Sequence, residues 1–93
     1  MDMQPTYPRV VSAQALAGTR LKITFSNGHT RIYDCTPLLS QEAFVLLRDE
    51  ALFRAVRPDP HGYGVVWNDE IDLAESELWI NGCPEVKANR AAG

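Results

Sequence analysis

The sequence predicts an α+β fold with a mainly antiparallel sheet. Three strand-like segments stand first in the chain, an Asn-Gly turn joins two of them, and two helix-like segments follow at separate places. The predicted order is a three-strand meander, a helix, a two-strand hairpin and a C-terminal helix, with the helices covering one sheet face. A chain of 93 residues, 45% hydrophobic and 23% charged, is one domain with a core of its own.

The strictest strand pattern covers residues 20–26, where Leu21, Ile23 and Phe25 alternate with polar residues. Strands are also predicted at 10–16 and 29–35. Asn27-Gly28 predicts a two-residue type I′ turn between residues 26 and 29. That turn pairs Ile23 with Ile32 and Lys22 with Tyr33. The polar side chains are then expected on one outer face of the sheet, which carries Lys22, Thr24, Arg31 and Tyr33.

The second half of the chain predicts helices and short strands. One broken helix is expected from about Pro37 to Arg48, followed by an extra capped turn at 49–53. Strands are expected at 54–59 and 65–67. The last helix is expected to begin at Asp72 as its N-cap and to end at Gly82. Residues 1–8 are predicted to be an extended lead-in, 9–82 the domain, and 83–93 a C-terminal tail.

The net charge and the distribution of apolar residues disfavour several classes of function. The net charge of −3 and the pI of about 5.2 disfavour nucleic-acid binding by bulk charge. The acidic excess lies at the C-terminal end, because residues 69–93 carry a net charge of −4 and residues 1–68 a net charge of +1. No apolar run approaches the ~20 residues of a membrane helix. We therefore expect a cytoplasmic protein without membrane contact, in which Cys35 and Cys83 are both free thiols.

No arrangement of residues predicts catalysis, a cofactor or a metal. His29 and His61 lie in predicted loops, without a nucleophile in a recognisable motif beside them. Cys35 follows Asp34, and a neighbouring carboxylate raises the pKa of a thiol rather than activating it. The acidic run at 69–77 is explained better by the start of a helix than by a metal site. We expect a protein that is not an enzyme.

Two surfaces are candidates for binding a partner. The first is the acidic stretch that contains Asp69, Glu70, Glu75 and Glu77. Trp67 and Trp79 are expected to pack in or beside the core, with a partner for each ring N–H; the alternative for Trp79 is an exposed anchor at a partner or dimer interface. The alternative is the outer sheet face, on which Lys22, Arg31 and Tyr33 would form a basic surface for nucleic acid.

An ordered set of short motifs between residues 8 and 80 resembles one known family. The set comprises Val10-Val11, Leu21-Lys22-Ile23-Thr24-Phe25-Ser26-Asn27-Gly28, Asp34, Pro37-Leu38-Leu39, Leu47-Arg48-Asp49, Leu52-Phe53, Val56, Asp59, Val66-Trp67-Asn68, Ile71-Asp72-Leu73 and Glu77-Leu78. It is similar to the small bacterial proteins of domain of unknown function 2442. One departure is Asp69-Glu70, where the family resemblance leads us to expect a glycine-containing turn.

The resemblance implies an α+β fold and no catalytic residues. It also implies an accessory or regulatory role, since relatives resemble modules joined to helix-turn-helix domains or encoded beside a second small protein in toxin–antitoxin-like pairs. Our first hypothesis is a non-enzymatic interaction module, antitoxin-like, whose partner is a small neighbouring-gene product or a second copy in a homodimer. The alternative is a nucleic-acid-associated regulator that uses the basic sheet face.

Overall fold

Two antiparallel sheets and four short helices make up the computed structural model, which describes residues 7–84. The larger sheet has the strand order β1-β2-β3-β7 and the smaller sheet the order β4-β5-β6. The strands are β1 (Val10–Leu16), β2 (Arg20–Phe25), β3 (Thr30–Asp34), β4 (Arg57–Pro58), β5 (Gly64–Val66), β6 (Asp72–Ala74) and β7 (Cys83–Pro84). The helices are the 3-10 helices η1 (Thr36–Ser40) and η2 (Glu42–Arg48) and the α-helices α1 (Glu50–Phe53) and α2 (Glu75–Asn81). The α+β class is therefore confirmed.

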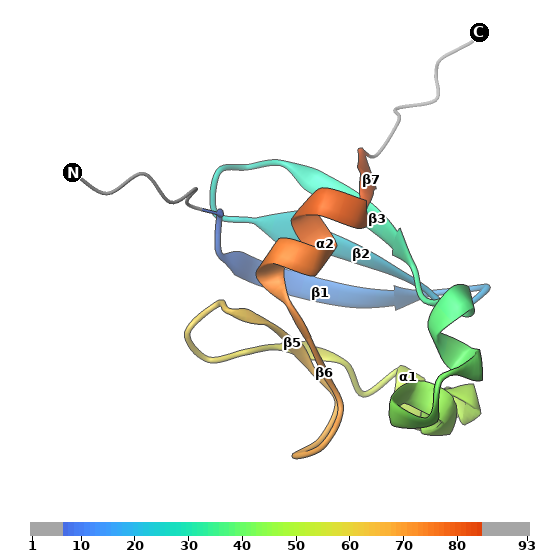
Figure 1. Ribbon diagram of the computed structural model, residues 1–93. Coiled ribbons are helices and arrows are strands. Elements are labelled where there is room, and N and C mark those ends of the chain that lie inside the picture. Colours follow the sequence, from blue (N-terminus) through green and yellow to red (C-terminus); the bar gives the residue numbers. More distant parts are fainter. Residues whose placement is uncertain (1–6, 85–93) are drawn as a thin grey trace, which may run out of the picture.

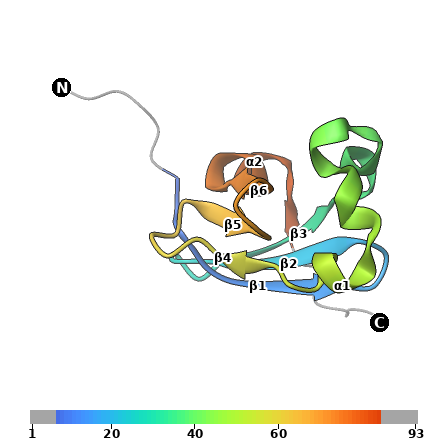
Figure 2. The same ribbon diagram turned by 90° about the horizontal axis from the view of Figure 1, so that it is seen from below.

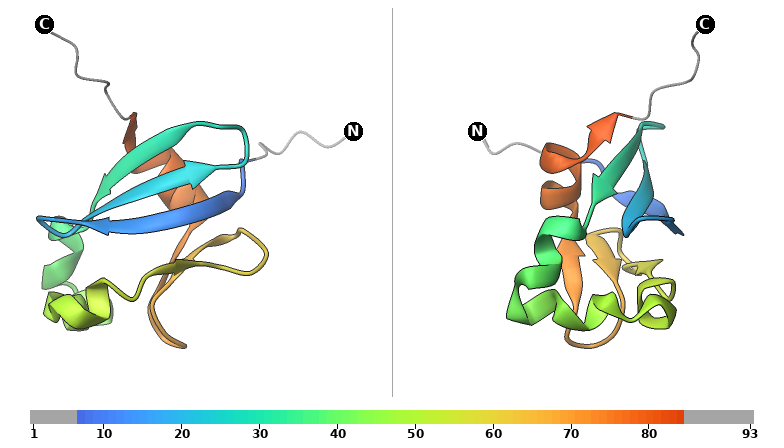
Figure 3. Two further views of the ribbon diagram at one scale, coloured as in Figure 1. Left: turned by 180° about the vertical axis from the view of Figure 1, so that it is seen from behind. Right: turned by 90° about the vertical axis from the view of Figure 1, so that its right-hand side faces the viewer.

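The smaller sheet and α2 lie on the same face of the larger sheet (Figures 1 and 2). The helical segment from η1 to α1 stands at one end of the larger sheet, beside the turn between β1 and β2. The view from behind shows β1, β2 and β3 with no other described element in front of them (Figure 3). The larger sheet thus has an inner face that packs and an outer face that is open, as is common for antiparallel sheets.

The core lies between the two sheets and α2. Leu21 and Ile23 of β2 are 0% exposed and Phe25 is 1% exposed, as their alternation predicts. Val65 of β5, Leu73 of β6 and Leu78 of α2 are buried on the opposite side. Burying a side chain of this size contributes about 1.5–3 kcal/mol, so the inner face of β2 is a major source of stability.

The predicted register between β2 and β3 is wrong by one residue. Gly28 has φ +87 and its N–H donates to the carbonyl of Phe25 at 2.9 Å, while the Phe25 N–H donates to the carbonyl of His29 at 2.9 Å. The loop therefore has three residues and ends in a left-handed glycine, which is the second common hairpin solution. Lys22 pairs with Ile32, and Leu21 pairs with Tyr33. A slip of one residue exchanges the two faces of β3.

The predicted helix from Pro37 to Arg48 is two 3-10 helices. Gln41 separates them with extended backbone angles of φ −92 and ψ 137. The capped turn that follows is confirmed, because the Asp49 carboxylate accepts a hydrogen bond from the Ala51 N–H at 3.0 Å. Both 3-10 helices expose most of their residues, and of the two only η2 buries a side chain completely, that of Leu47.

The last helix begins two residues later than predicted, because its N-cap is Ala74 and not Asp72. Asp72 is not an N-cap; it starts strand β6, in which Leu73 alone is buried and its neighbours are exposed. Helix α2 starts at Glu75 after Ala74, which makes no side-chain capping bond. The predicted end at Gly82 is confirmed, because α2 ends at Asn81 and Gly82 is its C-cap. Only glycine fits closely here, since a Cβ at residue 82 would come within 2.5 Å of the Leu78 carbonyl oxygen.

The chain after α2 begins with a strand and not with a tail. Cys83 pairs with Ile32 and Pro84 pairs with Arg31, which makes β7 an edge strand of the larger sheet. The remainder of the predicted tail, 85–93, and residues 1–6 of the predicted lead-in lie outside the described residues. The strand expected at 54–59 is reduced to two residues, β4. Within residues 7–84, every helix is too short or too polar to cross a bilayer.

Candidate functional site

The acidic stretch predicted as one binding surface is divided between two places. Asp69 and Glu70 are exposed in the turn between β5 and β6, where the Asn68 side chain accepts hydrogen bonds from the N–H groups of Glu70 and Ile71 at 2.8 and 3.0 Å. The glutamates of α2 lie at the other end of β6 (Figure 1). The turn and the helix are therefore separate sites.

A groove of about 360 Å³ lies between α2, β3 and η1, and we call it the acidic groove. Its floor and walls are formed by Ile32, Tyr33, Asp34, Pro37, Leu38, Glu77, Asn81 and Cys83. The Tyr33 hydroxyl donates a hydrogen bond to the Glu77 carboxylate at 2.7 Å and thereby ties α2 to the sheet. The groove thus combines an apolar wall with two carboxylates that come from different elements.

The polar surroundings determine the charge of this groove. Hydrogen bonds from the backbone N–H and the hydroxyl of Thr36 lower the pKa of Asp34, so this carboxylate stays ionised at neutral pH. Burial and the bond to Glu77 raise the pKa of Tyr33, so the phenol stays neutral. Among the described residues, those that line the groove include two acidic side chains and no basic one. The groove is therefore negative and suited to a cationic group.

Trp79 is half-buried and packs against three side chains, so it is not the exposed anchor that the sequence allowed. Its ring and that of Phe25 pack in a T-shaped arrangement with centroids 5.1 Å apart, and the His29 ring centroid lies 5.7 Å from that of Trp79. The Arg31 guanidinium lies 3.9 Å from the centroid on the ring face. Trp79 closes the core at the end of the larger sheet, and Arg31 covers it.

The alternative basic surface is not assembled as predicted. The register puts Arg31 opposite Ile23 and Tyr33 opposite Leu21, both on the inner face, while Lys22 shares the outer face with Ile32. Tyr33 is 5% exposed, and Arg31 donates to the Gly82 carbonyl at 3.4 Å. The one-residue shift in the hairpin is the physical reason that these three side chains do not meet.

The cysteines and histidines occupy different environments. Cys35 is completely buried, and burial together with the Asp34 charge raises the pKa of its thiol to about 12, the predicted direction. Cys83 is exposed, and both thiols are free.

His61 lies in the loop before β5, where its ring centroid is 5.7 Å from that of Tyr63. In the part of the chain that the structure describes, no three His, Cys, Asp or Glu side chains come together as metal ligands.

A larger cavity of about 580 Å³, which the sequence did not predict, lies between the β1–β2 turn and α1. Thr19 in this turn has φ +54, a left-handed conformation that is uncommon for a β-branched residue. Arg48, Glu50 and Arg54 line the opposite side. The only sequence signal for this side is the four-residue spacing of Glu50 and Arg54 on a capped turn. In the structure the Arg54 guanidinium and the Glu50 carboxylate form an ion pair with an N–O distance of 3.1 Å.

Comparison with known proteins places the chain in a family. Neither the curated proteins nor the solved structures include a match to this chain. A family model covers residues 10–82, which is nearly all of the described fold from β1 to the end of α2. The chain therefore belongs to the family described as protein of unknown function (DUF2442).

Proposed function

We propose that the protein is a non-enzymatic interaction module whose acidic groove binds a basic segment of a protein partner. The observation that supports this proposal is that Asp34 and Glu77 both line one groove, and that the described residues of this lining include no basic side chain. Arg20, the cross-strand partner of Asp34, lies outside the lining. Opposite charges across an interface speed the encounter of partners and select between them. A lysine or arginine side chain of the partner would complete the pairing.

An exposed apolar side chain beside the groove supports the same surface. Ile80 is 60% exposed on α2, and it follows Glu77 by three residues and therefore lies on the same side of the helix. Asn81, one residue further, lines the groove itself. An apolar contact next to polar and charged contacts is the usual composition of a protein interface. The partner is thus expected to present an apolar residue close to its basic one.

The proposed partner class rests on the resemblance described in the sequence analysis. We propose that the module acts in the cytoplasm as the accessory, antitoxin-like member of a pair, with a small neighbouring-gene product as its partner. A reducing compartment suits a protein with two free thiols. A homodimer formed through the same groove is the competing arrangement, and the experiment below distinguishes the two.

The experiment is capture of a partner by the tagged protein from its native cells at low salt, followed by light scattering and affinity measurement on the purified complex. The groove variants are Asp34→Asn and Glu77→Gln, which keep an oxygen that accepts the bonds from Thr36 and Tyr33. Each is expected to weaken the complex by about 3- to 10-fold at low salt and by less at high salt.

The matched controls are Asp69→Asn and Glu70→Gln, which remove the same charges at the separate β5–β6 turn. They are expected to leave the affinity unchanged. If the turn variants weaken the complex and the groove variants do not, the acidic groove is the wrong surface. A homodimer that binds nothing else would contradict the paired-module proposal.

A further inference from the structure

The large cavity between the β1–β2 turn and α1 has the properties of a small-molecule site. Its volume of about 580 Å³ lies in the range of about 300–1,000 Å³ that is usual for such sites. It is built from three parts of the chain: the end of β1 with the following turn, the start of η1, and the segment from η2 to α1. We propose that this cavity binds a small monocarboxylate with an apolar body, an activity separate from partner binding.

The walls explain the apolar half of this ligand. Ala15 of β1, Leu47 of η2 and Phe53 of α1 line the cavity, and the last two belong to the hydrophobic core. A ring or alkyl chain that enters here would leave water and extend the core outward. Apolar walls with a few polar groups at fixed places are typical of ligand sites.

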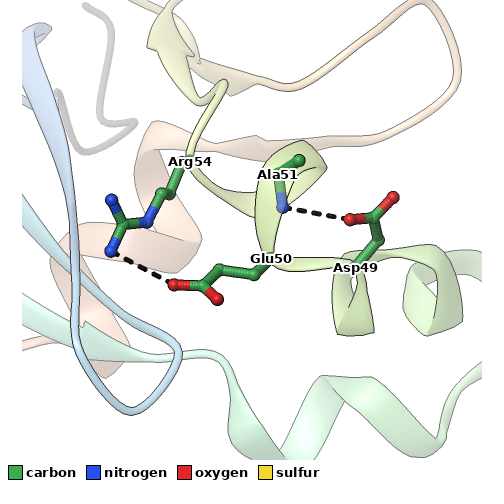
Figure 4. A network of polar contacts seen from close by, with 4 residues as sticks. All are labelled: Asp49, Glu50, Ala51 and Arg54. Carbon is green, nitrogen blue, oxygen red and sulfur yellow. Dashed lines mark hydrogen bonds and ion pairs between the residues drawn. The ribbon is translucent and has the colours of Figure 1, made fainter.

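The charged side of the cavity explains the carboxylate. Arg48, Glu50 and Arg54 line it, so the lining carries one more positive than negative charge. Figure 4 shows Glu50 and Arg54 extending from α1 on the side of the β1–β2 hairpin, while Asp49 lies on the other side of the helix. Arg54 is 72% and Glu50 75% exposed, so their ion pair is weak and can open.

The two arginines are the donors available to a carboxylate. The Nε of Arg48 donates to the Leu39 carbonyl at 3.2 Å, which fixes the side chain and leaves the two terminal nitrogens for a ligand. Arg54 can exchange Glu50 for the ligand, since a guanidinium fits any carboxylate in the same way. The anion would therefore lie between Arg48 and Arg54.

The threonine hydroxyls hold the opposite wall in place. Thr19 donates to the Gly18 carbonyl at 2.6 Å, and the Thr19 and Thr36 hydroxyls are 2.8 Å apart. The Thr19 carbonyl also accepts a bond from the Cys35 N–H at 2.9 Å. These contacts maintain the left-handed turn at Thr19, a conformation that is kept only where its surroundings enforce it. The wall is thus formed before a ligand arrives.

The test is a titration of the ¹⁵N-labelled protein with 4-phenylbutyrate, followed by NMR, beside its neutral counterpart 4-phenylbutan-1-ol. Saturable shifts are expected at Ala15, Thr19 and Thr36, with a Kd of about 1 mM or below for the carboxylate. The alcohol is expected to bind at least about 5-fold more weakly, because it lacks the charge that the arginines meet.

Two pairs of variants separate local from overall charge. Arg54→Gln is expected to weaken carboxylate binding by at least about 5-fold, and Glu50→Gln to strengthen it by about 2-fold, because it removes the competing acceptor. Arg57→Gln and Glu42→Gln change the same charges outside the cavity lining and are expected to have no effect. No saturable shift at the solubility limit of the probe, equal binding of the alcohol, or equal effects of cavity and control variants would overturn the proposal.

Discussion

The hydrogen bond between Tyr33 and Glu77 joins two residues that are 44 positions apart and connects the fold to the acidic groove. Tyr33→Phe keeps the ring in the core and removes only this bond. A lost bond to a charged acceptor costs about 1.5–3 kcal/mol. We expect Tyr33→Phe to lower the free energy of unfolding by about 1–2 kcal/mol, because Glu77 is only half-buried. Urea unfolding followed by circular dichroism measures it.

The control for this residue is Tyr63→Phe. Tyr63 is 52% exposed, and its stacking with Arg9 at 4.4 Å uses the ring and not the hydroxyl. Removal of the Tyr63 hydroxyl is expected to change the free energy of unfolding by no more than about 0.5 kcal/mol. If the two tyrosine variants cost the same, the bond to Glu77 contributes nothing. A double-mutant cycle with Glu77→Gln would then show no coupling.

Local chemistry at single residues was predictable from the sequence. Trp67 was expected in the core with a partner for its ring N–H, and it is 2% exposed and donates to the Phe53 carbonyl at 3.0 Å. The raised pKa of the Cys35 thiol was also predicted, because its cause includes the adjacent Asp34. Such predictions depend on neighbours in the sequence. The packing of Trp79 under Arg31 depends on distant ones and was not predictable.

At the scale of elements, the smaller sheet depends on one glycine. Gly64 of β5 has φ +150, and a side chain there would come within 1.9 Å of the Leu73 carbonyl oxygen in β6. Gly64→Ala therefore forces β5 and β6 apart, and we expect a loss of more than about 3 kcal/mol in the free energy of unfolding. Thermal and urea unfolding measure this loss.

Gly28→Ala is the matched control, since Gly28 also has a positive φ, +87, but nothing within 4 Å of the added carbon. Only the backbone conformation is penalised there, by about 1 kcal/mol. Similar losses for both alanine variants would mean that the close approach of β5 to β6 is unimportant. The two glycines thus separate steric conflict from conformational preference.

The elements that sequence reasoning placed wrongly are those with two locally acceptable solutions. Asn27-Gly28 suits a two-residue and a three-residue turn, and burial of Tyr33 beside Glu77 selects the second. Asp72 suits a helix cap, but Leu73 is buried against the core only if the chain is extended there. Tertiary packing decides between such alternatives, and a single sequence does not contain it.

At the scale of the whole molecule, the acidic groove and the cavity beside α1 both result from the chain topology. Asp34 and Glu77 line one groove because α2 and β7 return the chain to β3, and the β1–β2 turn lies near α1 because the segment from η1 to α1 stands at that end of the larger sheet (Figure 1). The sequence identified an acidic C-terminal surface and its glutamates but joined them to Asp69 and Glu70. The charge of a segment was predictable, whereas its division between two ends of β6 was not.

The stability of the whole molecule should fall at alkaline pH, because two acids are buried in their neutral forms. Burial raises the pKa of Cys35 from 9.0 to about 12, and burial with Glu77 raises the pKa of Tyr33 above its usual value of 10.0. A raised folded-state pKa contributes stability that is complete below the unfolded pKa and lost as the pH rises. The free energy of unfolding is therefore expected to fall by about 1.4 kcal/mol per pH unit above pH 9, and by about twice that above pH 10.

Variants assign each part of this alkaline loss to one group. Urea unfolding between pH 7 and pH 11 is expected to show no fall between pH 9 and 10 in Cys35→Ala, although that variant starts from a lower stability because a buried sulfur is removed. Cys83→Ala removes an exposed thiol and is expected to keep the full slope. Tyr33→Phe halves the slope above pH 10, and Tyr63→Phe leaves it intact. A slope that persists in Cys35→Ala would mean that the exposed thiol or another group, and not the buried one, makes the core sensitive to base.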